Sequence, residues 1–263
     1  MDQNTPKLWD TLWENNIPEC EDQLSLAKEE KSIRWNRIKQ FVLKEFGSFK
    51  NLKTIEIGAG AGTYSALMAK EDADVTLLDY SDKALKRSKE FFKRNRVEGK
   101  FVYENALELP KDYFNKYDLS MSFGLTEHFI DQDRININKV HFQVIRNGGM
   151  SFISVPNKYN PPYRILKFIC ELTGRWGVGM EIPYSRNELR KICHEIGINE
   201  INFLGDSLFS SLQFVNPFRI LKKFLKVKVS PVNIELIPYE KGSFLDEYFS
   251  YALIVVGKKT SQI

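Results

Sequence analysis

Cysteine and histidine are scarce in this chain of 263 residues. The three cysteines, Cys20, Cys170 and Cys193, are scattered and form no C-x-x-C pair. Such a set argues against a disulfide framework and against a cysteine-ligated zinc site. Because there are also only three histidines, we expect no metal centre.

A long apolar run is missing as well. No stretch reaches the roughly 18 apolar residues that a membrane-spanning helix needs. The first residues, Met1 to Asn4, are polar, so we expect no secretory signal peptide. These features predict a cytoplasmic protein.

The chain carries little excess charge. Its formal net charge is +4, with 43% hydrophobic and 27% charged residues, which is typical of a soluble globular protein. So small a positive charge gives the phosphates of nucleic acid little to bind, and we expect no nucleic-acid partner. The length suits one sizeable α/β domain with additions.

The most informative stretch runs from Thr54 to Ser65 and reads T-I-E-I-G-A-G-A-G-T-Y-S. A short buried strand is predicted before it over 52–57, and a helix is predicted to begin near Tyr64. The glycines therefore occupy a strand-to-helix turn, where an open α/β sheet builds a nucleotide pocket. Glycine lets the backbone turn sharply and lets a ligand approach without meeting a Cβ.

The spacing of these glycines separates two cofactor families. A dinucleotide fingerprint, G-x-G-x-x-G, needs a third glycine at position 63, which is Thr63 here. The observed E-x-G-x-G-x-G, from Glu56 to Gly62, resembles the first motif of the class I S-adenosylmethionine-dependent methyltransferases. The resemblance implies S-adenosylmethionine as cofactor, with the acidic residue near its cationic methionine part. A nicotinamide-dependent oxidoreductase is the weaker alternative.

Strands and helices alternate after this turn, which favours a parallel sheet. Strands are predicted at 53–57, 74–78, 101–103, 117–123, 150–155, 198–204 and 251–256. The resemblance implies a Rossmann-like, seven-stranded, mostly parallel sheet with helices on both faces and an antiparallel last strand. We divide the chain into an N-terminal helical cap (1–47) and a methyltransferase domain (48–263) with inserts at about 156–184 and 205–245.

Three later segments extend the resemblance. Asp79 ends the second strand and can accept both ribose hydroxyls, and Tyr80 can pack on the adenine. Asn105-Ala106 stands where the family has D-A, and an Asn carbonyl can still accept from the adenine amino group. The resemblance thus implies these cofactor-binding residues: Glu56, Gly58, Ala59, Gly60, Gly62, Asp79, Tyr80, Asn105, Ala106, Gly124 and Leu125.

The segment from Ser122 to Phe129 resembles a family stretch that often reads G-V-L-E-H. It places His128 beside the expected reaction centre. An unperturbed histidine pKa near 6.5 suits a general base, so His128 is the candidate catalytic residue. A purely structural histidine is the alternative, and the tyrosines at 159, 163 and 184 are other candidate bases.

The inserts combine aromatic and basic residues, and this composition predicts the chemical class of the acceptor. They suit a small or medium acceptor with an apolar or aromatic body and some negative charge; the basic residues are Lys158, Arg164, Lys167, Arg175, Arg219, Lys222, Lys223, Lys226 and Lys228. The candidate acceptor-binding residues are Trp13, Tyr159, Tyr163 and Tyr184. Residues 8, 9, 12 and 13 form one apolar helical face, which either packs on the domain or caps the pocket.

Two other features leave alternatives open. Asn160-Pro161-Pro162-Tyr163 matches a signature of amino-group methyltransferases, but it follows the fifth strand instead of the fourth, so we expect only a loop turn. Lysines interleave with apolar residues from Phe218 to Val229, as in interfacial helices. A non-catalytic membrane-surface or partner-binding module is therefore the alternative function. The oligomeric state stays open.

Overall fold

The computed structural model describes residues 4–15, 22–215 and 242–260. Within these ranges a seven-stranded sheet has the order β3-β2-β1-β4-β5-β7-β6. The strands pair in parallel except for β7, which runs antiparallel to β5 and β6. This confirms the predicted sheet. The strands are β1 (Lys53–Ile57), β2 (Asp74–Asp79), β3 (Lys100–Tyr103), β4 (Tyr117–Phe123), β5 (Ile145–Pro156), β6 (Glu200–Gly205) and β7 (Ala252–Lys258).

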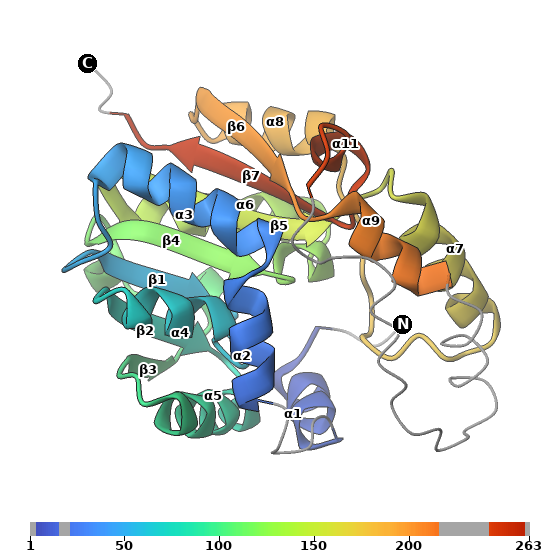
Figure 1. The fold of residues 1–263 in the computed structure, drawn as a ribbon, viewed down its shortest axis with the longest axis horizontal. Coiled ribbons are helices and arrows are strands. Elements are labelled where there is room, and N and C mark those ends of the chain that lie inside the picture. The colour runs from blue at the N-terminus through green and yellow to red at the C-terminus, as the bar shows by residue number, and fades with distance from the viewer. Residues whose placement is uncertain (1–3, 16–21, 216–241, 261–263) are drawn as a thin grey trace.

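Helices cover both faces of the sheet (Figure 1). The α-helices are α1 (Pro6–Asn15), α2 (Asp22–Glu30), α3 (Ile33–Phe46), α4 (Thr63–Lys70), α5 (Asp82–Asn95), α6 (Asp131–Val144), α7 (Pro161–Leu172), α8 (Arg186–Glu195), α9 (Leu208–Ser211) and α11 (Asp246–Phe249). Short 3₁₀ turns are η2 (Ala106–Glu108), η3 (Lys111–Tyr113), η4 (Thr126–His128) and η5 (Leu212–Val215).

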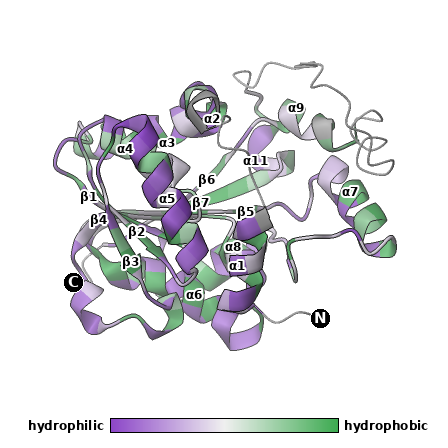
Figure 2. Ribbon diagram, turned by 90° about the horizontal axis from the view of Figure 1, so that it is seen from below, coloured by the Kyte–Doolittle hydropathy of each residue, from purple (hydrophilic) through white to green (hydrophobic). Residues whose placement is uncertain are grey.

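The strands alternate their side chains between two cores, because successive residues of a strand point to opposite faces. Leu253 and Val255 of β7 join the core beneath α6 and α8. Ile254 and Val256 join the core beneath α3, α4 and α5. Figure 2 shows this layering, with hydrophobic strands at the centre and a hydrophilic outer side on α5. Both sheet faces are therefore buried, as a mostly parallel sheet requires.

The glycine turn joins β1 to α4 as predicted. The N–H groups of Gly58 and Ala59 both donate to the Leu78 carbonyl, at 2.8 and 3.0 Å. Gly60 and Gly62 have φ values of 53° and 72°, in the left-handed region that glycine adopts without a Cβ penalty. The turn is thus anchored to β2, and its backbone lies open toward the end of the sheet.

The helices before β1 differ in what they cover. Ser32 and Gly47 cap α3, and α3 buries Trp35, Ile38 and Val42 in the core. By contrast, α1 packs against α5. The first 47 residues therefore serve more than one purpose, and their division into a separate cap stays a prediction.

The two inserts carry helices of their own. Asn160 begins α7, since its side-chain oxygen accepts from the Tyr163 N–H at 2.8 Å. The N-P-P-Y sequence is therefore a helix N-terminus instead of the expected loop turn. The segment from Phe218 to Val229 lies outside the described residues. Among the described ones, the structure contains no helix whose length and hydropathy suit a membrane span.

Candidate active site

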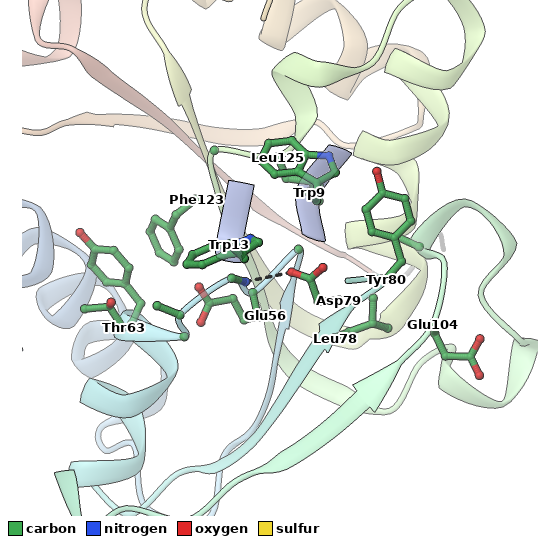
Figure 3. A pocket seen from close by; sticks show the side chains of 18 of the residues that line it. Trp9, Trp13, Glu56, Thr63, Leu78, Asp79, Tyr80, Glu104, Phe123 and Leu125 are labelled. Carbon is green, nitrogen blue, oxygen red and sulfur yellow. Dashed lines mark hydrogen bonds between the residues drawn. The ribbon is translucent and has the colours of Figure 1, made fainter. Parts of the chain in front are cut away.

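A cavity of about 280 Å³ opens at the carboxyl ends of β1, β2 and β4. Figure 3 shows Glu56 and Asp79 in it, with Trp13 lying close to Phe123. All eleven residues that the sequence predicted for the cofactor line this cavity, and its walls are completed by Trp9, Trp13, Ala61, Thr63, Tyr64, Leu78, Glu104, Phe123 and Phe129. The sequence motifs thus converge on one pocket.

Asp79 ends β2 and faces the glycine turn. Its two oxygens accept from the Gly60 N–H at 2.9 Å and from the Ser81 N–H at 3.0 Å. Burial raises the pKa of this carboxyl, while these N–H groups oppose the rise. Each oxygen keeps a second lone-pair direction, so Asp79 can hold the turn and still accept from a ligand.

Glu56 is the penultimate residue of β1, just before the same turn. One of its oxygens accepts from the N–H and the hydroxyl of Ser65, at 3.1 and 2.5 Å, which fixes the beginning of α4. Burial raises its pKa to about 7. Near neutral pH the carboxyl therefore exists in both forms, and a cationic group in the pocket would favour the ionised one.

Tyr80 and Asn105 are partly used by the fold itself. The Tyr80 hydroxyl bonds the Asn4 side-chain oxygen at 2.6 Å, which ties β2 to the segment before α1. The Asn105 side-chain oxygen accepts from the Leu107 N–H at 3.1 Å and caps η2. The second lone pair of that oxygen is the one that could still meet an adenine amino group.

Helix α1 lines the pocket through Trp9 and Trp13 and also packs against α5, so its role as a cap stays a prediction. A Cβ added to Gly60 would lie 2.6 Å from the Trp13 ring. Only glycine at this position lets the ring approach so closely. Trp9, Phe123 and Phe129 also form walls, and the sequence motifs did not assign them. The apolar face of 8, 9, 12 and 13 already contained the signal for Trp9.

His128 belongs to η4 and is 5% exposed. Its Nδ1 lies 2.7 Å from the Met180 carbonyl. Because a carbonyl only accepts, Nδ1 carries the proton in the neutral ring and Nε2 holds the free lone pair. Burial lowers the pKa of His128, so the ring is neutral at physiological pH.

The three tyrosines proposed for the acceptor lie in different surroundings. Tyr159 is 56% exposed. Tyr163 is buried and bonds Glu181, and burial raises its pKa. Tyr184 is buried against Thr126 and Arg134, and burial raises its pKa to about 12. Both buried phenols stay protonated at neutral pH, which leaves His128 as the better base. Roles in acceptor binding stay predictions for all three.

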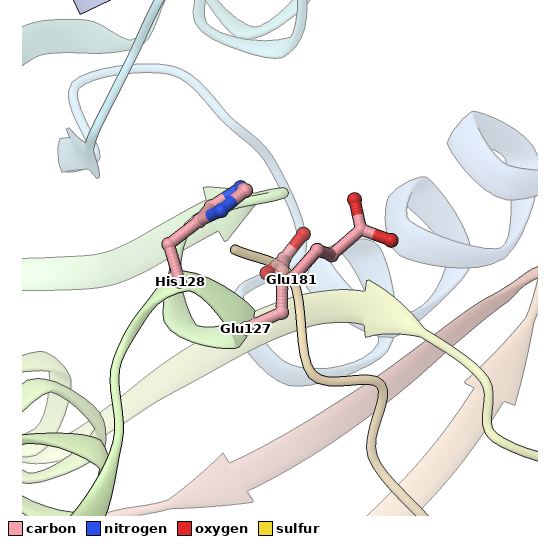
Figure 4. Close-up of side chains that lie close together, drawn as sticks. All are labelled: Glu127, His128 and Glu181. Carbon is pink, nitrogen blue, oxygen red and sulfur yellow. The ribbon is translucent and has the colours of Figure 1, made fainter. Parts of the chain in front are cut away.

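Two carboxyl groups lie close to His128 (Figure 4). One ligand atom from each of Glu127, His128 and Glu181 lies within 4.8 Å of the others. Glu127 is 2% exposed, and its Oε2 has no hydrogen-bond partner within the described part of the chain. Burial raises its pKa to about 8. Burial thus favours the neutral form of the Glu127 carboxyl, which suits proton transfer; the absence of a metal stays a prediction.

Residues 55–149 match a family model described as a methyltransferase domain. The chain contains a class I S-adenosylmethionine-dependent methyltransferase domain. The match spans the glycine turn, Asp79 and His128, and it includes every residue that lines the pocket except Trp9 and Trp13.

Curated relatives and solved structures support the assignment of this methyltransferase domain. The ubiquinone biosynthesis O-methyltransferase of Pelagibacter ubique (strain HTCC1062) is 27% identical over 202 residues, which are 74% of this chain and 80% of that protein. That of Photorhabdus laumondii is 28% identical over 120 residues, or 45% of this chain and 48% of the relative. Magnesium protoporphyrin IX methyltransferase from Synechocystis PCC 6803 aligns with a TM-score of 0.58 at 12% identity, covering 96% of this chain and 93% of that one. At that identity the likeness concerns the fold.

The pocket of the methyltransferase domain fits S-adenosylmethionine. The cofactor carries an ammonium, a carboxylate, a sulfonium and two ribose hydroxyls. Buried carboxyl groups of Glu56 and Asp79 stand at the ends of neighbouring strands, where one can face a cation and the other can accept from hydroxyls. The glycines of the turn between them carry no Cβ, which suits the close approach of a ligand.

The buried Glu127 carboxyl predicts how stability depends on pH. Its pKa is about 8 in the folded chain against an ordinary 4.5, so unfolding releases a proton between these values. The free energy of unfolding should therefore fall as pH rises from about 4.5 to 8, by a few kcal/mol. Glu127→Gln should flatten this dependence in urea unfolding at pH 5, 7 and 8.5. The exposed Glu195→Gln is the matched control; equal slopes for all three proteins would contradict the prediction.

Proposed function

We propose that this domain transfers a methyl group to a hydroxyl oxygen of a small or medium-sized, largely apolar acceptor. The observation that carries the proposal is the hydrogen bond from His128 Nδ1 to the Met180 carbonyl, which leaves Nε2 free to accept a proton. A hydroxyl attacks well when a base removes its proton in the transition state. The names of the relatives, which are O-methyltransferases, support oxygen over nitrogen or carbon.

The cofactor-facing residues take roles that follow from their chemistry. Asp79 accepts from the ribose hydroxyls, Glu56 faces the cationic methionine part, and Tyr80 and Asn105 flank the adenine. Gly124 and Leu125 supply backbone and an apolar wall at the end of β4. S-adenosylmethionine supplies an activated methyl group that an in-line displacement moves to the acceptor. Alignment of this kind can be worth roughly 7–11 kcal/mol, so the domain needs little beyond orientation and one base.

The surroundings of His128 restrict the chemical class of acceptor that we propose. Trp9 and Phe129 are aromatic walls of the pocket, which supports an apolar or aromatic body. The charged neighbours of His128 include the carboxyl groups of Glu127 and Glu181. The ammonium group of Lys167 already forms an ion pair with Glu171 and lies over the Trp176 ring. The polar end that reacts is therefore proposed to be an uncharged hydroxyl, and any negative charge of the acceptor to lie away from it.

Product analysis tests this proposal directly. The full chain is incubated with S-adenosylmethionine and matched aromatic acceptors that carry a hydroxyl, an amino group or only carbon positions. We expect S-adenosylhomocysteine and a methyl ether from the hydroxyl acceptors, at a rate that a chelator leaves unchanged. Methylation confined to amino or carbon acceptors would overturn the assignment to oxygen. If the chelator abolishes the rate and a divalent cation restores it, the proposal that His128 acts as the base without a metal ion is overturned.

A further inference from the structure

Helix α1 points two tryptophans at two different parts of the site. Trp9 and Trp13 are four residues apart, so they lie on the same helical face. The Trp13 ring rests on the glycine turn at Gly60. The Trp9 ring makes an edge-on contact with His128, with ring centroids 4.8 Å apart and planes at 80°. One helix therefore contacts both the wall of the cofactor pocket and the His128 ring outside it.

The position of α1 depends on the segment that follows Asp79. Asp10 Oδ1 accepts from the Ser81 hydroxyl at 2.6 Å and from the Lys83 N–H at 3.3 Å. Both Tyr80 and Trp9 bond the Asn4 side-chain oxygen at 2.6 Å. These contacts dock α1 onto the end of β2 and the beginning of α5. Docking of α1 is thereby linked to the strand end that bears Asp79.

Two kinds of contact hold the His128 ring. The Met180 carbonyl fixes Nδ1, and Trp9 packs against the ring from α1. The charged or titratable groups near it are Lys167 of α7, its neighbour Glu127, and Glu181. Trp9 has no charge of its own, so it acts by contact and by keeping water from the ring.

We propose that Trp9 is a positioning residue for His128, which makes the base complete only while α1 is docked over the cofactor pocket. Trp9 and Trp13 both line the cofactor cavity, so a cofactor bound there adds contacts to α1 and stabilises the docked helix. The docked helix in turn holds Trp9 against His128. Cofactor binding is thereby coupled to the assembly of the base, and the acceptor meets a complete site only after the cofactor has bound.

Titration of the His128 imidazole by NMR tests the contact without turnover. His141 is buried and its pKa is lowered to about 3, so it stays neutral over the range, and a His194→Gln variant identifies the third ring. Trp9→Ala should let water reach His128 and raise its pKa toward the ordinary 6.5. Trp9→Phe should keep most of the lowering. Trp13→Ala, which removes the other tryptophan of the same face, should change it far less in the cofactor-free protein.

Saturation with S-adenosylhomocysteine completes this experiment. In the native chain the ligand should lower the His128 pKa further, because it stabilises docked α1; in Trp9→Ala this response should be lost. A His128 pKa that is the same in the native chain, Trp9→Ala and Trp9→Phe would overturn the proposal, provided that thermal unfolding shows all three to be folded.

The role in turnover rests on the proposed function, and kinetics separate the two. Trp9→Ala should lower kcat by about 10- to 100-fold, with partial rescue in Trp9→Phe, and should move the acidic limb of the pH–rate profile upward. If Trp9→Ala shifts the His128 pKa but leaves kcat unchanged, the proposed contact between Trp9 and His128 holds and His128 is not the base. An unchanged His128 pKa with a lowered kcat would refute positioning by Trp9.

Discussion

Replacing His128 with alanine is expected to lower kcat by about 10²- to 10⁴-fold, which is the usual contribution of a positioned general base. The binding of S-adenosylmethionine should stay unchanged, because the His128 ring lies outside the cofactor cavity walls. Since burial lowers the pKa of His128, the native rate should rise with pH below the ordinary histidine value and be level at neutral pH. Rapid quench or steady-state assays across pH give kcat, and calorimetry gives Kd.

The asparagine variant separates a base from a structural histidine. In His128→Asn the side-chain N–H₂ can still donate to the Met180 carbonyl, which the ring does at 2.7 Å. It has no basic nitrogen, so we expect its kcat to be as low as that of His128→Ala. Recovery of most of the activity in His128→Asn would show that the ring matters only for holding the segment at 180. The exposed His194→Asn serves as the control substitution.

The strands and the glycine turn were predictable because their signals are local. Strand β4 has its predicted ends, Tyr117 and Phe123, and β1 has its predicted ends as well. Strand β5 was not fully predicted: it begins at Ile145, whereas the sequence predicted a strand over 150–155. Its pairing with β4 is irregular between Tyr117 and Leu119, so the ladder extends past Gly148 and Gly149 to Ile145.

The cofactor side of the site was predictable for a similar reason. Glu56 and Asp79 lie in the last residues of β1 and β2, and the glycines follow β1. Parallel neighbouring strands end at the same edge of a sheet. Their convergence in one cavity follows from the strand order alone. Even so, the sequence did not indicate that Glu56 and Asp79 are also structural, each accepting from the turn or helix that follows it.

The acceptor side could not be predicted because it depends on contacts between distant segments. His128 is fixed by Met180 and touched by Trp9, which lie on an insert and on the N-terminal helix. Nothing in the local pattern of either segment points to His128. The same holds for Glu181, whose carboxyl reaches the cluster from the insert. Residue type identified the base candidate, but only tertiary packing determines its tautomer and its exposure.

Replacing Asp79 with alanine is expected to abolish measurable binding of S-adenosylmethionine, weakening it by at least about 100-fold. The change removes the charge-assisted hydrogen bonds that we propose between Asp79 and the ribose, each worth about 1.5–3 kcal/mol. About 1.4 kcal/mol corresponds to tenfold in Kd. It also leaves the buried N–H groups of Gly60 and Ser81 without the carboxylate they now bond. Calorimetric titration with S-adenosylmethionine and S-adenosylhomocysteine measures the loss, with NADH as a negative ligand.

Two variants keep this test informative if the glycine turn itself rearranges. Asp79→Asn retains one acceptor oxygen for either Gly60 or Ser81, so it should fold like the native chain and bind the cofactor with intermediate affinity. Asp82→Ala removes an exposed carboxylate three residues later and should leave Kd unchanged. If Asp79→Ala is folded and binds S-adenosylhomocysteine as the native chain does, the pocket at the end of β2 is not the cofactor site. If Asp82→Ala loses as much affinity as Asp79→Ala, the effect comes from net charge and not from the ribose contact.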